Sequence, residues 1–358
     1  MKKHLIAAAV AAAVAVPAAA QVTVYGRFDQ AYNTVETKTA TTSKATHTGF
    51  EGGVAGSRLG FRAAEDLGGG LKAAVVYEFG VDPGENTGVG ATRLGFAEIA
   101  GGFGTLRMGR QVSPAKAVAD TYNANGNSTN FAPGDVNNAI TSIDNRVSNA
   151  ITYLTPTVGG FSAQLQYADA NTKTTTETST TLLNGTAGAD GSTSGSWRTT
   201  AQGKIEAIGI NYAAGPLAIG VATHDQTVAT AGAITKDNRV AFGAMYSLGS
   251  TKLYLENSTR KSKTAAGATD IDRDVTTIGI TLPFGATTIA AQLFDGDRKL
   301  GATDTTAADF DGFKIRATYA LSKRTGVYGQ MGETNTKPTS GAQKTTVEGY
   351  GVGMYHTF

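Results

Sequence analysis

Arginines at alternate positions are the residues of this sequence whose type and spacing could carry chemistry. Arg27, Arg58, Arg62, Arg93 and Arg107 each lie in a short segment in which polar or small residues alternate with apolar ones. A period of two is the signature of a β-strand, so each arginine shares a face with other polar residues and opposes an apolar face. Because a guanidinium is always charged, the polar faces of these strands need water.

Catalytic motifs are absent from the sequence. The four histidines are widely separated, at His4, His47, His224 and His356, and no HExxH, GxSxG or GKS/T run occurs. There are no cysteines, which excludes disulfides and thiolate metal sites. Glycine-rich pieces such as GVGATRLG lack the helix that a dinucleotide turn requires and are interpreted as turns. We expect no catalytic residue, metal site or cofactor, although a hydrolase with dispersed catalytic residues stays open.

The first twenty residues, MKKHLIAAAVAAAVAVPAAA, have the charged, apolar and small-residue plan of a signal peptide. The apolar run is shorter than the roughly 20 residues that a membrane-spanning helix needs. We predict removal of residues 1–20, which leaves one domain of residues 21–358. Loss of two lysines from 31 Lys+Arg leaves 29 against 29 Asp+Glu. The neutral balance, with no basic run carrying interleaved aromatics, disfavours nucleic-acid binding.

The composition favours a β protein with a wet interior. The chain has 46 glycines, 13 tyrosines and 14 phenylalanines but only 8 prolines, a mix that suits many short strands joined by tight turns. No apolar run of about 18 residues follows the signal, so no transmembrane helix is expected in the mature chain. The hydrophobic share of 41% is low for a large soluble sandwich but suits a hollow barrel.

Alternating segments recur along the whole mature chain, and short and long connections alternate between them. This asymmetry is typical of outer-membrane barrels, whose periplasmic turns are short and whose outer loops are long. A closed barrel also pairs every backbone group inside the bilayer, and sixteen strands are enough to leave an aqueous channel. The sequence predicts a 16-stranded antiparallel transmembrane β-barrel with strands at residues 22–32, 57–66, 71–79, 92–100, 103–110, 147–155, 160–168, 204–213, 217–226, 239–248, 251–261, 273–281, 287–297, 310–320, 325–332 and 345–358.

Residues 111–145 form a connection that is too long for an ordinary turn. Arginines stand at both edges, with Arg107 and Arg110 before it and Arg146 after it. Long loops inside compact folds are usually functional or disordered. We interpret this segment, the third of eight outer loops, as folding into the barrel to narrow a water-filled pore. Arg110 has the parity of the opposite face, which favours a loop anchor or a subunit contact.

Four motifs, in this order along the chain, resemble the general-diffusion porins of Gram-negative bacteria, in particular the beta-proteobacterial branch. They are SRLGFRAAEDLGGGLKA, GGFGTLRMGRQ, RVSNAITYLTPTVGGFSAQLQYA and the C-terminal YGVGMYHTF. The resemblance covers the whole mature chain. It implies a homotrimer of 16-stranded barrels in the outer membrane, with the third outer loop folded inward. It also implies a row of basic residues on the barrel wall, opposite acidic residues on that loop.

The resemblance places specific residues at the constriction. Matching of the strand motifs puts Arg27, Arg58 and Arg93 on the basic wall, and Arg62 and Arg107 share their inward parity. A family arginine is missing near residues 152–154, and Arg146 is the candidate replacement at a different height. The acidic loop motif is also missing, and the nearest candidates are Asp120, Asp135 and Asp144. An alternative is that some arginines only pair with carboxylates at strand ends, such as Arg62 with Glu65 or Asp66.

The resemblance also implies how the protein assembles and what it does. The terminal Phe358 looks like the signal that the barrel-assembly machinery reads, and an interfacial aromatic is the alternative. The expected partners are outer-membrane lipid, lipopolysaccharide, and small hydrophilic solutes and ions that cross passively. More arginines than loop aspartates predict a mild anion preference. A substrate-specific channel, or an enzyme or adhesin on a barrel, are the alternative functions.

Overall fold

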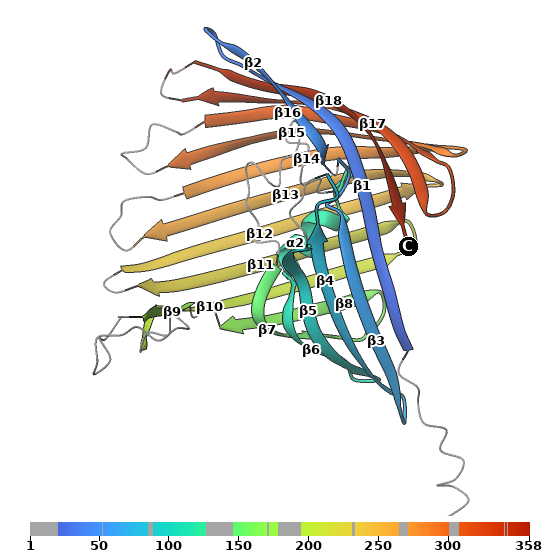
Figure 1. Ribbon diagram of the computed structural model, residues 1–358, viewed down its shortest axis with the longest axis vertical. Coiled ribbons are helices and arrows are strands. Elements are labelled where there is room, and N and C mark those ends of the chain that lie inside the picture. Colours follow the sequence, from blue (N-terminus) through green and yellow to red (C-terminus); the bar gives the residue numbers. More distant parts are fainter. Residues whose placement is uncertain are drawn as a thin grey trace, which may run out of the picture.

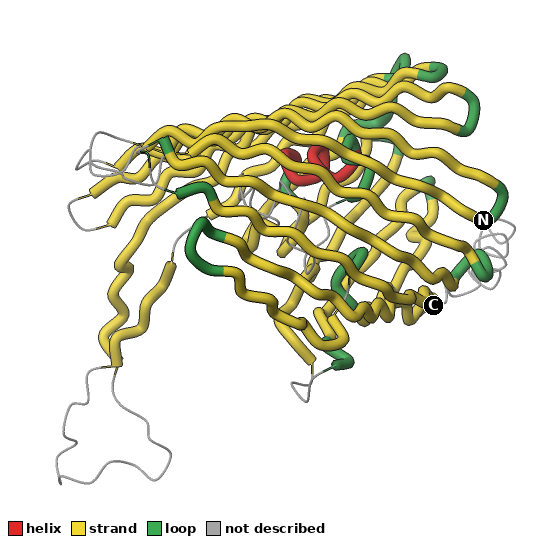
Figure 2. The backbone as a smooth tube through the Cα atoms, turned by 90° about the horizontal axis from the view of Figure 1, so that it is seen from above, coloured by secondary structure: helices red, strands yellow, loops and turns green. Residues whose placement is uncertain are grey.

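The computed structural model describes residues 21–51, 53–84, 89–126, 146–169, 172–177, 195–230, 233–264, 271–300, 308–339, 341 and 343–358. The predicted signal peptide, residues 1–20, lies outside this set, so its cleavage stays a prediction. The described residues form one antiparallel sheet that curls into a tilted barrel, with neighbours in the sheet following chain order almost throughout (Figures 1 and 2).

Sixteen strands make the wall, which confirms the predicted fold. They are β1 (Gln21–Lys38), β3 (Arg58–Gly68), β4 (Leu71–Val81), β5 (Val89–Gly101), β6 (Gly104–Val112), β7 (Arg146–Leu154), β8 (Phe161–Asp169), β10 (Gly195–Ala214), β11 (Leu217–Thr230), β12 (Ala233–Leu248), β13 (Thr251–Thr264), β14 (Ile271–Phe284), β15 (Thr287–Leu300), β16 (Ala308–Ala320), β17 (Thr325–Pro338) and β18 (Thr345–Thr357). Two shorter strands, β2 (Ser43–Glu51) and β9 (Thr172–Glu177), extend β1 and β10 as hairpins on the long-loop side.

The two ends of the chain close the barrel. β1 pairs with β18 from Arg27 opposite Thr357 to Lys38 opposite Thr346. Gly26 and Phe358 exchange both backbone hydrogen bonds, at 3.1 and 3.2 Å. The closure removes the free sheet edge, as a strand sheet in a bilayer requires.

Most wall strands continue further toward the long loops than the alternation predicts. β10 begins at Gly195 and β17 ends at Pro338, whereas the sequence predicts strands at 204–213 and 325–332. The prediction of a loop over residues 33–56 is wrong in part, because the end of β1 and all of β2 lie there. These extensions are rich in Thr, Ser and charged residues, so they pair as strands without the apolar face that alternation detects.

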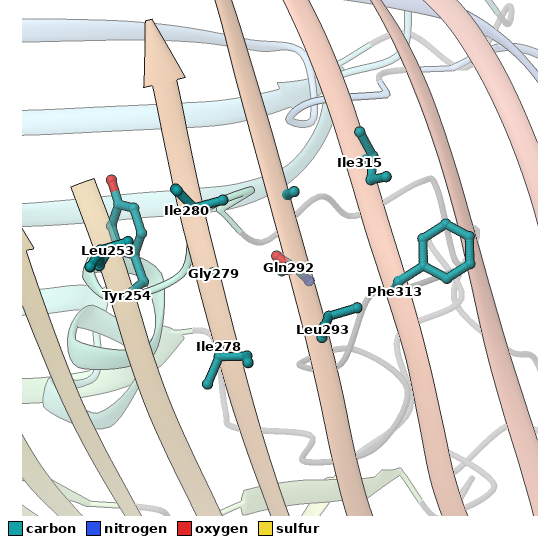
Figure 3. Close-up of a pocket in the computed structure, with 10 residues that line it drawn as sticks. Leu253, Tyr254, Ile278, Gly279, Ile280, Gln292, Leu293, Phe313 and Ile315 are labelled. Carbon is teal, nitrogen blue, oxygen red and sulfur yellow. The ribbon is translucent and has the colours of Figure 1, made fainter. Parts of the chain in front are cut away.

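The two faces of the wall differ in chemistry. Large apolar side chains are exposed on the outward face of every region of the barrel, including Val24, Val75, Ile208, Leu293 and Val352. Figure 3 shows part of this outward surface, a shallow groove on β13–β16 lined by Leu253, Ile278, Ile280, Leu293, Phe313 and Ile315. An apolar belt of this kind suits contact with lipid, so the groove is part of the membrane-facing surface and not of the pore.

Candidate pore constriction

A short helix, α2 (Pro114–Thr121), lies inside the barrel, as Figure 2 shows in red. Ser113 caps its N-terminus by accepting the Lys116 N–H at 3.2 Å, and Pro114 occupies the first turn, where a missing N–H costs nothing. Among the described residues, no helix is long and apolar enough to cross a membrane. Because α2 belongs to the 111–145 segment, the described part of this segment lies inside the lumen.

An apolar contact holds α2 against the inner face of β11 and β12. Ala115, Val118, Ala119 and Tyr122 of the helical segment form one buried cluster with two wall residues, Ala222 and Ala241. All six have at most 3% of their surface exposed. Burying these side chains together provides the main stabilisation of the docked helix, at about 25 cal/mol per Å² of apolar surface removed from water.

Glycines on the wall make room for this contact. A Cβ added at Gly243 would lie 2.3 Å from the Tyr122 ring, and one at Gly220 would lie 2.6 Å from it. A Cβ at Gly279 would lie 2.7 Å from Ala124. We call Gly220, Gly243 and Gly279 the glycine seat. Because these residues have no side chain, Tyr122 and Ala124 pack directly against the backbone of the wall strands.

Polar contacts fix the chain after α2 further around the wall. Asn123 Nδ2 lies 3.5 Å from a carboxylate oxygen of Glu256 on β13. Asn125 Nδ2 donates to the Lys314 carbonyl at 3.3 Å, and Arg316 Nη1 donates to the Asn125 carbonyl at 2.9 Å. The described part of the segment therefore runs along the inner wall from β8 to β16, and these described residues leave the side formed by β1 and β3–β5 uncovered.

The uncovered side carries Arg27 on β1. Arg27 Nη2 lies 2.8 Å from Asp29 Oδ2, and its guanidinium stacks 4.3 Å from the centre of the Tyr355 ring. Asp29 is fully buried and also accepts the Tyr328 hydroxyl at 2.6 Å and the Ala55 N–H at 3.0 Å. Asp29 thus orients Arg27 and ties the first long loop to the inner wall.

Arg58 and Arg93 stand beside Arg27. Arg58 lies directly opposite Arg27 in the β1–β3 ladder, and its Nε donates to the Gly56 carbonyl at 3.2 Å. Arg93 Nε lies 2.7 Å from Glu78 Oε1, and Glu78 is 5% exposed. The electrostatic environment of Arg58 includes Arg93, Glu78 and Arg27, so these side chains share one region of the lumen.

A register shift in β5 changes one prediction. The alternation predicts Leu94 and Phe96 on the apolar outer face, opposite Arg93. In the structure Phe96 is 9% exposed and lies under the Arg107 guanidinium, 4.2 Å from it. The pairing register between β4 and β5 shifts at Arg93, which is one extra residue on β5. Such a bulge changes which side chains point inward on its two sides. Arg93 reaches Glu78 through this bulge, not through regular alternation.

Arg146 and Arg110 lie at the two ends of the 111–145 segment. Arg146 faces Val112 in the β6–β7 ladder and interacts electrostatically with Arg93, Glu78 and Arg58. Arg110 donates from Nε to the Thr92 carbonyl at 2.9 Å and from Nη1 to Ser148 Oγ at 2.7 Å. Arg110 therefore bridges β5 and β7, the anchor geometry that its parity favours.

Arg62 and Arg107 form a separate pair, nearer to the short turns. Arg107 Nη2 lies 2.8 Å from Glu98 Oε2, and Arg62 Nη2 lies 3.4 Å from Glu98 Oε1. Arg62 therefore pairs with Glu98 across the wall, in place of Glu65 or Asp66 on its own strand. Two arginines with one carboxylate give this layer a net charge of +1, the same as three arginines, Arg27, Arg58 and Arg93, with the two carboxylates of Asp29 and Glu78.

Asp120 is the loop aspartate that the structure describes, because Asp135 and Asp144 lie outside the described residues. Asp120 bonds Lys116 one helical turn earlier. Burial of the carboxyl group raises the pKa of Asp120, and the nearby charges of Lys116 and Arg146 partly oppose the rise. The described part of the acidic loop is therefore weakly charged, since Lys116 offsets Asp120.

Acidification is expected to increase the anion preference of the pore through Asp120. As the pH falls, a carboxyl with a raised pKa becomes neutral at a higher pH than an ordinary aspartate, whose pKa is about 3.9. Its protonation leaves the Lys116 charge without an opposing carboxylate. Reversal potentials measured across a salt gradient at falling pH should show this step, and D120N should lack it. Identical pH profiles for the two proteins would contradict the assignment.

One basic residue of this region was missed from the sequence. Arg316 on β16 is near Arg27 and Asp29 and donates to the chain that follows α2. Its signal was present, because Lys314 and Arg316 alternate with Phe313 and Ile315. The basic residues that the structure brings together, here called the constriction cluster, are Arg27, Arg58, Arg93, Arg146 and Arg316.

A closed barrel with an apolar outer face, a charged inner face and a chain segment folded into its lumen defines a membrane channel protein. The family model for Gram-negative porins matches residues 7–339. The chain belongs to the Gram-negative porin family. It is therefore an outer-membrane channel for passive diffusion. Among the described residues, no group of His, Cys, Asp and Glu is arranged to hold a metal ion.

Individual relatives agree with the family. Outer membrane porin protein 32 of Delftia acidovorans is 32% identical, over 95% of this chain and 91% of that protein. Major outer membrane protein P.IB of Neisseria gonorrhoeae is 38% identical over 47% of this chain and 48% of that protein. The solved anion-selective porin from Comamonas acidovorans superimposes with a TM-score of 0.71 at 26% identity, covering 95% of this chain and 100% of that one.

Proposed function

We propose that this porin prefers small hydrophilic anions, and that the constriction cluster sets the preference. The observation that carries the proposal is the charge of the constriction cluster. Its five arginines come from β1, β3, β5, β7 and β16, and the carboxylates described among them are Asp29 and Glu78. Charged rings at a narrow point favour ions of opposite sign, and α2 opposite the cluster adds little negative charge.

The relatives support the same direction. One similar solved structure is described as an anion-selective porin. The anion preference is expected to strengthen at low salt, because the Debye length grows from about 10 Å at 0.1 M to about 30 Å at 0.01 M. A preference that did not change with ionic strength would mean that fixed charges are not its source.

Changing Arg58 to alanine tests the proposal. Arg58 has no ion pair among the described residues, so its removal subtracts one positive charge without stranding a carboxylate. We expect the reversal potential in a salt gradient to shift toward cations while the barrel stays folded. R324A is the matched control, because Arg324 lies exposed in the turn between β16 and β17. Equal reversal potentials for R58A and R324A would remove Arg58 from the constriction.

The other functions considered have weaker support. A substrate-specific channel would need groups that recognise one solute, and the described inner wall shows mainly charges. Dispersed catalytic residues for a hydrolase, and an adhesive loop surface, find no support in the described geometry. We infer a non-enzymatic diffusion pore, and competition of a single solute for ion current at low concentration would favour the specific channel instead.

We also infer assembly as a homotrimer through the barrel-assembly machinery, in contact with lipopolysaccharide. Phe358 directly follows β18 and lies beside Gly26, whose added Cβ would lie 2.4 Å from the Phe358 ring. Phe358 thus lies at the closing seam, and 47% of it is exposed on the outer face. F358A is expected to reduce the amount of heat-resistant trimer in isolated outer membranes, compared with the exposed-turn variant R324A. Wild-type trimer levels in F358A would contradict the assembly role.

A further inference from the structure

Part of the first long loop leaves the sheet beside β1. The β1–β3 ladder ends where Arg27 lies opposite Arg58. The β1–β2 ladder begins where Ala31 lies opposite Glu51. Between these two pairs β1 has three residues, whereas the chain that faces it has six. Six residues cannot pair one to one with three, so part of this chain has to leave the ladder. We call its described part, residues 53–57, the strap.

The strap lies on the lumen side of the wall. Asp29 shares the inner face of β1 with Arg27, two residues earlier. Its carboxylate accepts the Gly53 N–H at 3.3 Å and the Ala55 N–H at 3.0 Å. The Gly53 N–H also lies 3.1 Å from the Tyr328 hydroxyl, which itself donates to Asp29 at 2.6 Å. Because these partners are inward side chains of β1 and β17, the strap is held inside the barrel.

Ser57 supplies the hydrogen bonds that the β1 ladder lacks at this point. Its Oγ accepts the Asp29 N–H at 2.9 Å and donates to the Asp29 carbonyl at 3.0 Å. Both residues have at most 5% of their surface exposed, and buried backbone groups need partners. The Val81 N–H bonds the Ser57 carbonyl at 3.1 Å. The end of the strap is therefore fixed to both β1 and β4.

Glycines on β18 make room beneath the strap. Gly353 and Gly351 lie opposite Ala31 and Asn33 in the β1–β18 ladder. A Cβ added at Gly353 would lie 2.5 Å from the Tyr328 ring, and one at Gly351 would lie 2.0 Å from Asn33 Oδ1. Side chains of β1 and β17 therefore meet across the bare backbone of β18, and the strap packs on top of them.

The strap adjoins the chain that follows α2. A Cβ added at Gly53 would lie 2.7 Å from Gln330 Nε2 on β17. Gln330 lies directly opposite Arg316 in the β16–β17 ladder, and Arg316 donates to the Asn125 carbonyl at 2.9 Å. Neighbouring strands are about 4.8 Å apart, so the strap begins one strand beyond the contact of Asn125. The described parts of two loops thus follow each other along the inner wall from β8 to β1.

We propose that the strap is a second insert that sets the width of the pore, and that Asp29, Ser57 and Tyr328 hold it in place. Residues 53–57 read GVAGS, so the strap has no charged side chain. It acts by occupying space, because a hydrogen-bonded chain takes up about 4.8 Å of the lumen. The inference rests on the proposed diffusion pore and adds a steric limit that is distinct from the charge of the constriction cluster.

G53V tests the strap by displacing it. The added Cβ would lie within 2.8 Å of Gln330, Tyr328 and Ala31, whereas the ladders of β1 and β17 keep their hydrogen bonds. We expect the single-channel conductance to rise by roughly half, since a chain about 4.8 Å across leaves the lumen. Larger sugars should also enter liposomes. G329V is the matched control, because a Cβ at Gly329 of β17 has no heavy atom within 4 Å.

Y328F tests the same contact without removing a charge or a ring. It deletes the hydroxyl that bonds both Asp29 and the Gly53 N–H. The conductance should rise as in G53V, and G53V/Y328F should show no further gain, because both changes release one strap. Y319F is the control, since Tyr319 on neighbouring β16 is 50% exposed. Additive gains would overturn the role of Tyr328 in holding the strap.

Other outcomes would contradict the pore-narrowing role. Unchanged conductance and sugar permeation in heat-resistant G53V trimers would overturn the proposal. A lower conductance would overturn it too, because the bound strap would then keep the pore open. Where G53V yields no heat-resistant trimer, the conductance of Y328F decides between the same results.

The strap test is separable from that of the anion preference. Neither G53V nor Y328F removes a charge, so the sign of the reversal potential in a salt gradient should stay that of the wild type. A wild-type protein that prefers cations would refute the proposed anion preference, whatever the conductance of the strap variants. Normal anion preference with unchanged conductance in both variants would refute the strap alone.

Discussion

G243V is expected to release α2 from the barrel wall and to increase the single-channel conductance. The added side chain would occupy the place of the Tyr122 ring, whose atoms lie within 2.5 Å of an added Cβ. Overpacking of a well-filled contact costs about 1–3 kcal/mol. This cost lowers the stability of the contact between α2 and the wall. The strands around Gly243 keep their full ladder of hydrogen bonds, so the barrel itself should still close.

The matched control for this change is G329V, because a Cβ at Gly329 has no heavy atom within 4 Å. Conductance steps in planar bilayers, and permeation of larger sugars into liposomes, should rise in G243V and stay normal in G329V. Normal conductance in folded G243V trimers would mean that α2 does not narrow the pore.

R93A is expected to shift selectivity toward cations more strongly than R58A does. Removal of Arg93 leaves the Glu78 carboxylate, 5% exposed, without its ion-pair partner. Losing one partner of a fully buried pair costs about 3–5 kcal/mol; the cost here is smaller because Arg93 borders the wet lumen. R93A changes the net charge by one unit, as R58A does, but the Glu78 carboxylate then acts on passing ions without a neighbouring charge to oppose it.

The double variant R93A/E78Q separates these two effects. It removes both charges, so most of the selectivity shift and of the lost heat resistance should return toward wild type. Double-mutant cycles isolate the coupling of two residues in contact. A selectivity shift in R93A/E78Q as large as that in R93A would show that the Glu78 carboxylate plays no part in it, and additive losses of heat resistance would show that Arg93 and Glu78 are not coupled. E78Q alone should move selectivity toward anions.

The barrel is predictable from the sequence because each strand is specified by residues that are close together in the chain. Alternation of apolar and polar residues within eight to eleven positions fixes each strand and its two faces, as in β1, where Arg27 lies inward as expected. The strand ends beyond the membrane are not predictable in the same way. Beyond the membrane neither face of a strand has to be apolar. The sequences of β2 and of the end of β17 therefore show no alternation, although their backbones pair as strands.

The site is less predictable because it depends on contacts between distant residues. The slip beside Arg93 reverses the face of Phe96, and no feature of the nine-residue motif TRLGFAEIA marks it. Arg239, Arg260, Arg273 and Arg298 lie side by side only through the register that joins β12 to β15, and the flanking residues of the last three are polar, so alternation does not mark them. The glycine seat is invisible in sequence, since its role is defined by Tyr122, about 120 residues earlier than Gly243 in the chain.

Arg110 makes the entry and exit of the 111–145 segment independent of what lies between them. It grips a backbone carbonyl on β5 and a hydroxyl on β7, and neither partner belongs to the segment. Insertions, deletions or whole replacements between these strands would therefore begin and end at the same fixed points. Exchange of the residues between these fixed points would change the size of the pore while Arg110 still joined β5 to β7.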